Sequence, residues 1–312
     1  MIGEDSPPPT ASAGEAAESV GGTAPQVALR TPHFRTGRPP SLYHYTSLTG
    51  MIGIISSKAI WATDCSFLND RSEFDYARSL FLSELAQMTN PARTPGHVFH
   101  HLADGLDEEY RDLIEAVTDA IGRRWLDTYV VSFCESGDLL SQWRGYAPDK
   151  GYAIEFDTEQ VALATRETWQ EFGILDRVAY GREDGRMLLD TALDAVRNSN
   201  LSVGHRMRAS AEAVAPLIRI KHPSFAEERE WRATVNAKWS DLLHQDMKTF
   251  LKFRAGPFGP TAYLELAFAS SAITGVVVGP GANSDSRKRG VERLLQANGF
   301  EAAVRESEVP LR

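Results

Sequence analysis

The sequence is poor in cysteine, with only Cys65 and Cys134 among its 312 residues. Two cysteines cannot build a disulfide framework of the kind that stabilises small secreted domains. They also lack the CxxC or cysteine–histidine spacing of a zinc site. We therefore expect two partly buried, reduced thiols, and a cytoplasmic protein is the simplest interpretation.

Long hydrophobic runs are missing as well. The longest apolar stretches, such as 273–278, are far shorter than the roughly 20 residues that span a bilayer. The first residues, MIGED, have neither a basic start nor an apolar segment, so we expect no secretory signal and no membrane partner.

Positive charge is in deficit, because the net charge is -9 at pH 7. This balance argues against broad electrostatic binding to DNA, RNA or anionic membranes. A local basic site stays compatible with it. The one basic cluster, 287–289, falls at the start of a predicted helix, where we expect solvated surface.

The first forty residues differ from the rest in composition. Residues 1–40 are rich in proline, alanine, glycine, serine and glutamate and have no apolar periodicity. Such a segment cannot bury enough surface to offset its ordering entropy, so we predict a disordered tail. Residues 41–312 carry the apolar patterns and are predicted to form a single α+β domain of catalytic type.

Strands and helices do not alternate regularly in this domain. Apolar residues recur at helical spacing at 74–88 and 106–125, which predicts two helices there. Together they form a predicted helical insertion at about 74–127. Because regular βαβ units are missing, we predict a mixed, largely antiparallel sheet and not a doubly wound parallel one. The predicted strands are 42–46, 60–63, 128–134, 151–157, 174–180, 230–235, 249–254, 263–268, 273–278 and 302–305, and further helices are predicted at 47–58, about 183–219 and 286–298.

The segment around EEREWRATV is the most informative for chemistry. If it is extended from Glu228 onward, its period of two places Glu228, Glu230 and Arg232 on one face, while Trp231 packs on the core. Two carboxylates so close repel unless a cation, solvent or a ligand compensates them. Arg232 is one compensating candidate, which would make this face a plain surface charge ladder; the other interpretation is an active site.

Two further segments carry candidate binding residues. In LYHYTS, the imidazole of His44 beside Tyr45 suits a sugar hydroxyl and a stacked ring, although a lone strand histidine is more often structural. In SFCE and QWRGY, Trp143 and Tyr146 are either a core aromatic pair or a platform for a flat ring. The sequence slightly favours the core.

Several common catalytic patterns are missing. The sequence contains no GxSxG elbow, and the GPG turn at 279–281 has neither GxGxxG nor a GK[ST] ending. The histidines His97, His100 and His101 have no carboxylates at ligand spacing, so we predict no metal. We expect Asp70 to cap the helix that follows it.

Taken together, several blocks resemble a large, mostly uncharacterised bacterial domain family. They are an LYHYTS-like start, an LND-x-x-E turn, an SFCE segment followed by QWRGY, an EREWR strand, a VVGPGA-like turn and a VPLR-like ending. Here they occupy 42–47, 68–73, 132–135 with 142–146, 228–232, 277–282 and 307–312. The resemblance spans roughly residues 41–312.

The layout is also similar, more remotely, to the ADP-ribosyltransferase superfamily. His44 matches its first-strand histidine, and Glu228 with Glu230 matches its late-strand E-x-E motif; the middle residue is either Ser132 or Tyr146. This resemblance implies a split β core and NAD as substrate, with no metal. A carboxylate facing the ribose would stabilise its oxocarbenium-like transition state.

The roles below are implied by that resemblance. Glu230 would stabilise the cationic sugar and Glu228 would orient the acceptor, which is a protein, a nucleic acid or water. His44 would bind the adenosine ribose, and Tyr146 or Trp143 would stack on nicotinamide. Arg232 and Arg254 are candidates for the pyrophosphate.

Three functions remain open at this point. The first is an NAD-consuming ADP-ribosyltransferase-like enzyme, which is compatible with a toxin or phage-defence effector. The second is a binding or sensor module that kept the fold without turnover. The third is a metal-dependent nuclease or phosphoesterase that uses Asp70, Glu73, Glu228 and Glu230 around a divalent ion.

Overall fold

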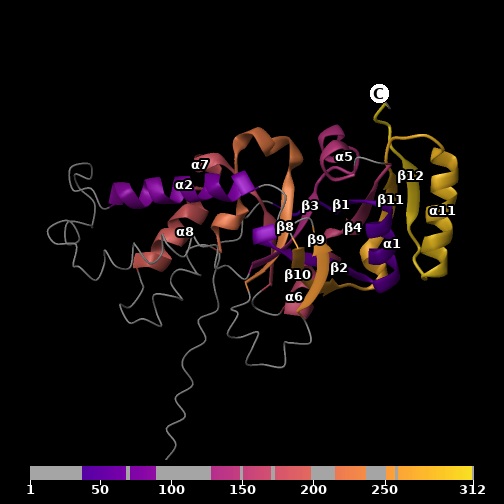
Figure 1. The fold of residues 1–312 in the computed structure, drawn as a ribbon, viewed down its shortest axis with the longest axis horizontal. Helices are drawn as coiled ribbons and strands as arrows, with labels where there is room; N and C mark the ends of the chain where they lie inside the picture. The colour runs from indigo at the N-terminus through magenta and orange to yellow at the C-terminus, as the bar shows by residue number, and fades with distance from the viewer. Residues whose placement is uncertain are drawn as a thin grey trace, which may run out of the picture.

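A computed structural model describes residues 37–67, 71–88, 128–147, 150–169, 173–197, 215–236, 251–256 and 259–310. It contains helices and a large sheet of mixed but mostly antiparallel strands (Figure 1), so the α+β prediction is confirmed. Most of the predicted tail, the predicted helix 106–125, Asp70 and the three histidines between 97 and 101 lie outside the described residues.

The ten predicted strands appear in the predicted order, the one at 174–180 divides into β5 and β6, and β7 was not predicted. The strands are β1 (Ser41–Thr46), β2 (Ala59–Asp64), β3 (Thr128–Cys134), β4 (Tyr152–Asp157), β5 (Gly173–Arg177), β6 (Ala179–Tyr180), β7 (Ile220–Lys221), β8 (Glu230–Asn236), β9 (Lys252–Gly256), β10 (Gly259–Ala267), β11 (Ile273–Val278) and β12 (Ala303–Glu306). Most boundaries agree with the predictions to within a few residues, because β-branched and aromatic residues are concentrated in the strands.

The helices include two that the sequence analysis did not predict, α5 and α6. The α-helices are α1 (Leu48–Ser57), α2 (Arg71–Met88), α5 (Leu140–Tyr146), α6 (Thr158–Trp169), α7 (Gly181–Asp184), α8 (Arg186–Arg197) and α11 (Ser284–Ala297). Short 3-10 turns are η1 (Cys65–Phe67), η4 (Leu217–Arg219), η5 (Pro223–Glu228) and η7 (Ser270–Ala272). No helix in the described ranges is long and apolar enough to cross a membrane.

The large sheet divides along one edge of β3. Its strand order is β12-β11-β4-β1-β3-β2-β10-β9, and β8 pairs with β3 and β5 off this path. β8 follows β3 over its whole length. On the opposite edge, β2 pairs with Tyr129 and Val130, whereas β1 meets β3 only at Cys134. The backbone between Val130 and Cys134 therefore has no ladder partner on that side.

The main hydrophobic core lies between the sheet and helices α1, α6 and α11. It contains Ile55 of α1, Val161 of α6 and Leu295 of α11, all buried against strand residues such as Trp231 and Phe133. A smaller cluster occupies the other side of the sheet, where Trp143 of α5 packs among buried residues of β1, β3, β4 and β11. Helix α5 thus covers the face that carries the candidate site.

A second hydrophobic cluster holds α2 and α8 together. Phe81 of α2 and Leu188 of α8 are fully buried with Leu217 of η4 and Ile220 of β7. In Figure 1, α2 and α8 lie together beside the sheet. This cluster fixes β7, which pairs with β6 in a small parallel ladder and carries Lys221 toward β8.

The strand predicted at 230–235 begins where expected, but its extension back to Glu228, on which the shared face of the two acids depended, is not formed. Glu228 belongs to η5, and Arg229 takes a left-handed conformation with φ 42°. The extended segment therefore starts at Glu230 and not at Glu228. From Glu230 the period of two holds, because Trp231 is buried in the main core while Glu230 and Arg232 lie on the opposite face.

Candidate functional site

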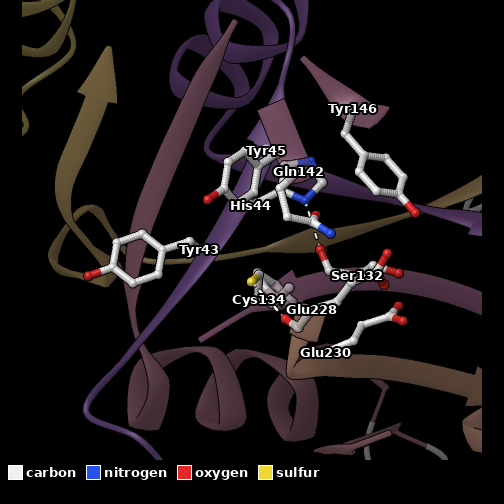
Figure 2. Close-up of a pocket in the computed structure, with 10 residues that line it drawn as sticks. Tyr43, His44, Tyr45, Ser132, Cys134, Gln142, Tyr146, Glu228 and Glu230 are labelled. Atoms are coloured by element: carbon white, nitrogen blue, oxygen red, sulfur yellow. Dashed lines mark hydrogen bonds between the residues drawn. The ribbon is translucent and has the colours of Figure 1, made fainter. Parts of the chain in front are cut away.

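A pocket opens at the division of the sheet, between β1, β3, α5, η5 and β8. It encloses about 370 Å³ of empty space, its open mouth included. This lies at the low end of the range for ligand pockets and fits a ring and a sugar better than a whole dinucleotide. Its lining, drawn in Figure 2, consists of Tyr43, His44, Tyr45, Ser132, Phe133, Cys134, Gln142, Tyr146, Glu228 and Glu230.

His44 bridges the gap in the ladder of β3. Its Nδ1 lies 2.9 Å from the carbonyl oxygen of Ser132, one of the positions that β1 and β2 leave unpaired. A carbonyl only accepts, so Nδ1 carries the proton and donates it. The neutral ring then keeps Nε2 as an acceptor on a side chain that lines the pocket.

The imidazole of His44 is held in its neutral form. Burial lowers its pKa below the ordinary value of 6.5, and the hydrogen bond to Ser132 offsets this only in part. Desolvation disfavours the charged form of a base, which accounts for the direction. At neutral pH, His44 is therefore a fixed hydrogen-bond acceptor and not a cation.

Glu230 is a buried and ionised carboxylate. Its side chain lines the pocket at 6% exposure, and Arg232 donates to both oxygens, Nε at 2.7 Å and Nη2 at 3.1 Å. Burial alone would raise its pKa, but the charges of Arg232 and Lys221, with hydrogen bonds from Arg232 and Ser132, lower the pKa to about 2. The pocket therefore presents a permanent negative group.

Lys221 joins the two acidic residues of the pocket. Its Nζ lies 2.5 Å from Glu228 Oε2 and 3.2 Å from Glu230 Oε2, and the side chain is 1% exposed. The ammonium also lies 4.8 Å from the ring centroid of Phe225. Buried ions need such pairing, since an unpaired charge in the interior is very unfavourable. The surface charge ladder considered for this strand is therefore wrong.

Lys221 was not among the predicted site residues. Its contact with Glu230 depends on η5 and on the left-handed Arg229, which turn the chain back between β7 and β8. The repulsion expected between Glu228 and Glu230 did indicate that a cation was needed. It did not indicate which one, because Arg232 lay nearer in the sequence.

Three predicted binding residues lie elsewhere. Trp143 is buried against Tyr45 with ring centroids 4.7 Å apart, and its Nε1 donates to Asp138 at 2.7 Å, so it is a core residue without a free face for nicotinamide. Arg232 is bound to Glu230 and to the carbonyl of Ile218.

Arg254, the third, lies on β9 and outside the pocket lining. Its guanidinium donates to Thr63 at 3.2 Å and lies 5.9 Å from the ring centroid of Trp61. Its place, beyond β2 and β10 in the strand order, separates it from the pocket. Neither Arg232 nor Arg254 is placed to bind a pyrophosphate in this pocket.

The other predicted residues meet in the pocket. Tyr45 forms part of the wall, because its hydroxyl donates to the carbonyl of Ser136 and accepts from the amide of Leu139, both at 2.9 Å. Tyr146 is 44% exposed at the rim. With Ser132 also in the lining, both candidates for the middle active-site residue remain open.

The pocket also has lining residues that the sequence analysis did not propose. Cys134 donates its thiol to the carbonyl of Glu228 at 2.8 Å, and burial raises its pKa to about 11, so it stays protonated. Gln142 is buried on α5 with its amide on the pocket. Within the described segments, no three histidine, cysteine or acidic residues are grouped to hold a metal ion.

These features define an α+β domain with an acidic pocket at the division of its sheet. Residues 142–233 match the model of a family described as "Protein of unknown function (DUF2971)". This match, which runs from α5 into β8, confirms the predicted likeness to an uncharacterised family and carries no sign of an ADP-ribosyltransferase relationship. No curated protein and no solved structure shows a significant match to the chain.

Proposed function

We propose that the chain is an NAD-consuming enzyme of the ADP-ribosyltransferase type. In this reaction the bond between nicotinamide and the ribose C1′ breaks, and nicotinamide leaves with the bonding electrons. An acceptor then forms a bond to C1′ and gives up its proton. The observation that carries the proposal is that His44 and Glu230, far apart in the sequence, line one pocket.

The state of Glu230 supports an electrostatic role. A carboxylate with a pKa of about 2 does not exchange protons near neutral pH, so it is unsuited to act as a general acid or base. It is suited to face the positive charge that develops on the ribose as nicotinamide leaves. Lys221 and Arg232 hold it in place, so little reorganisation accompanies the reaction.

The state of His44 supports a role in binding a sugar. Its Nε2 is an acceptor, and a ribose hydroxyl is a donor of matching strength. Tyr146 adds an aromatic ring at the rim, where it can stack on a flat base. Glu228 lies beside Glu230 and is the candidate for orienting the acceptor, which is a protein, a nucleic acid or water.

The metal-dependent alternative has less support. A divalent ion would have to sit between the carboxylates of Glu228 and Glu230, and the ammonium of Lys221 already bonds to both. Asp70, which that alternative also needs, lies outside the described residues, and so does the side chain of Glu73.

The decisive experiment measures nicotinamide release from NAD by the purified full-length chain, alone and with cell lysate as a source of acceptors. Glu230→Gln should abolish release and transfer. Glu227→Gln is the matched control, because Glu227 is exposed on η5, lies outside the pocket lining and loses the same charge. Equal release from the wild type and Glu230→Gln refutes the proposal.

A second arm separates turnover from binding. If NAD raises the melting temperature of the wild type but is neither cleaved nor transferred, the pocket belongs to a binding module without turnover.

A toxin or defence role is a further expectation. It predicts growth arrest on expression that Glu230→Gln relieves and Glu227→Gln does not.

A further inference from the structure

Gln142 brings an amide to the pocket that no described protein group bonds. Its side chain is 6% exposed and lines the pocket, yet it makes no hydrogen bond with any residue that the structure describes. Neither amide atom is among the fully buried atoms without a partner, so the amide is open to the pocket. In Figure 2 the amide lies among His44, Ser132 and Tyr146. The donor and acceptor atoms of this amide are therefore available to a ligand in the pocket.

Helix α5 holds this amide in position. The backbone amide of Leu139, at the N-cap, donates to the hydroxyl of Tyr45 at 2.9 Å. Trp143, the next residue after Gln142, donates to Asp138 and packs edge-on against Tyr45. The same Asp138 accepts the backbone amide of Glu308 at 2.7 Å, which ties the C-terminal segment to this helix. The backbone that carries Gln142 is therefore anchored to the wall of the pocket.

The surroundings of Gln142 define what it can recognise. Tyr146, which is 44% exposed, brings an aromatic ring to the lining, and this suits a flat ring. A glutamine amide offers one acceptor and two donor hydrogens, so it pairs with a group that both accepts and donates. The carboxylate oxygens of Glu228 and Glu230 in the lining repel a second carboxylate at close range, so a neutral group is favoured.

A carboxamide on an aromatic ring meets all of these conditions. We propose that Gln142 is the specificity-determining residue that reads the carboxamide of the nicotinamide ring of NAD. Its Nε2 donates to the carbonyl oxygen of the carboxamide, and its Oε1 accepts from the NH2 group of the carboxamide. This inference rests on the proposed function, since it assigns one end of that substrate to one wall of the pocket.

The test compares two ring ligands that differ in one group. Nicotinamide carries the carboxamide. 3-Acetylpyridine keeps the carbonyl but has a methyl group in place of the NH2. Both are titrated by ligand-detected NMR into the full chain. Wild type should bind nicotinamide about tenfold more tightly, the factor expected for one hydrogen bond to a buried polar group. Gln142→Met, close in shape but unable to make these bonds, should bind both equally.

Two further variants control the result. Gln142→Leu replaces the amide by another apolar side chain and keeps the test available if the methionine variant folds poorly. Arg144→Gln changes an exposed residue of the same helix outside the lining and should keep the preference for nicotinamide. A ratio of affinities is read within each variant, so a general loss of stability does not mimic the effect.

The outcomes separate this inference from the proposed function. A wild type without preference, or a Gln142→Met variant that retains it, overturns the role of Gln142 even if NAD is cleaved in a Glu230-dependent manner. The protein could also prefer nicotinamide in a Gln142-dependent manner and yet neither cleave nor transfer NAD. That result would support the role of Gln142 and refute the proposed enzymatic activity.

Discussion

Arg232 binds both carboxylate oxygens of Glu230, although the two residues are only two positions apart on β8. Period-two spacing brings the side chains to one face of the strand, and burial leaves the acid with little solvent to replace the guanidinium. Two-point binding also fixes the orientation of the carboxylate. The acid of the pocket is therefore both charged and immobile.

Removing Arg232 should destabilise the fold strongly. Arg232→Met leaves Glu230 buried with Lys221 as its remaining cation and leaves the carbonyl of Ile218 without this donor. Breaking one partner of a buried ion pair costs about 3–5 kcal/mol, and we expect the lower end because Lys221 remains. Urea unfolding monitored by circular dichroism measures the loss.

The control is an arginine in an exposed ion pair. Arg186 pairs with Asp190 one turn along α8, and both side chains are about half exposed. Arg186→Met should change the free energy of unfolding by about 0.5 kcal/mol or less. Similar losses in the two variants would mean that burial adds nothing to the pair of Arg232 and Glu230.

The ionisation of Glu230 should make the free energy of unfolding depend on pH in the acidic range. Its pKa is lowered from 4.5 to about 2 in the folded state, so the folded state disfavours protonation. The contribution of this group is therefore present above pH 4.5 and is lost as the pH falls toward about 2.

We expect the free energy of unfolding to fall more steeply for the wild type than for Glu230→Gln between about pH 5 and pH 3. The glutamine variant starts from lower stability, because Lys221 and Arg232 lose their shared anion. Denaturant titrations at several pH values give both slopes. Parallel curves would show that Glu230 does not titrate with the lowered pKa.

The sequence predicted the strands of this site well because strand-favouring residue types are a local signal. β1, β3 and β8 are rich in aromatic and β-branched residues, and this placed His44, Ser132 and Glu230 on strands. The need for a cation beside Glu230 also followed from local spacing. That Arg232 meets this need was one of the two interpretations of the spacing, although we expected it at the surface.

The features of the site that could not be predicted depend on contacts between distant segments. Lys221 reaches Glu230 through the reversal at η5, and Gln142 enters the pocket because α5 folds against β1. The side-chain type of Arg254 suggested phosphate binding, but its strand lies at the far edge of the sheet. Residue type indicates a possible chemistry, and only the tertiary fold decides which groups share a pocket.

Gly279 shows how two of the sequence blocks meet. A Cβ at this position would lie 2.8 Å from the ring of Trp143 and 2.7 Å from the carbonyl oxygen of Gly151. Gly279→Ala should therefore displace Trp143 and destabilise the fold by about 1–3 kcal/mol, as overpacking does. Gly290→Ala is the control, since Gly290 lies inside α11 with no atom near the added methyl.

The two substitutions should change the free energy of unfolding in opposite directions. Alanine at position 290 should stabilise the protein by about 0.5–1 kcal/mol, because glycine is a poor helix former. Thermal unfolding of both variants gives the comparison. A melting temperature of Gly279→Ala at or above that of the wild type would contradict the close packing of Trp143 on this turn.

His44 should make the protein less stable on the acidic side of neutrality. The folded state lowers its pKa below 6.5, so the stability from the neutral ring is present above pH 6.5 and is lost as the pH falls through the lowered folded pKa. His44→Gln keeps a donor for the carbonyl of Ser132 and does not titrate. Its free energy of unfolding should therefore fall less than that of the wild type between about pH 7 and pH 5.

The His44 Cε1 proton provides an independent check. We expect its NMR resonance to titrate with a midpoint below 6.5, because burial opposes protonation while the bond to Ser132 only partly favours it. The resonance is assigned from its disappearance in His44→Gln. A midpoint at or above 6.5 would mean that solvent reaches the ring freely, and a cationic imidazole would then have no Nε2 acceptor for a ribose hydroxyl.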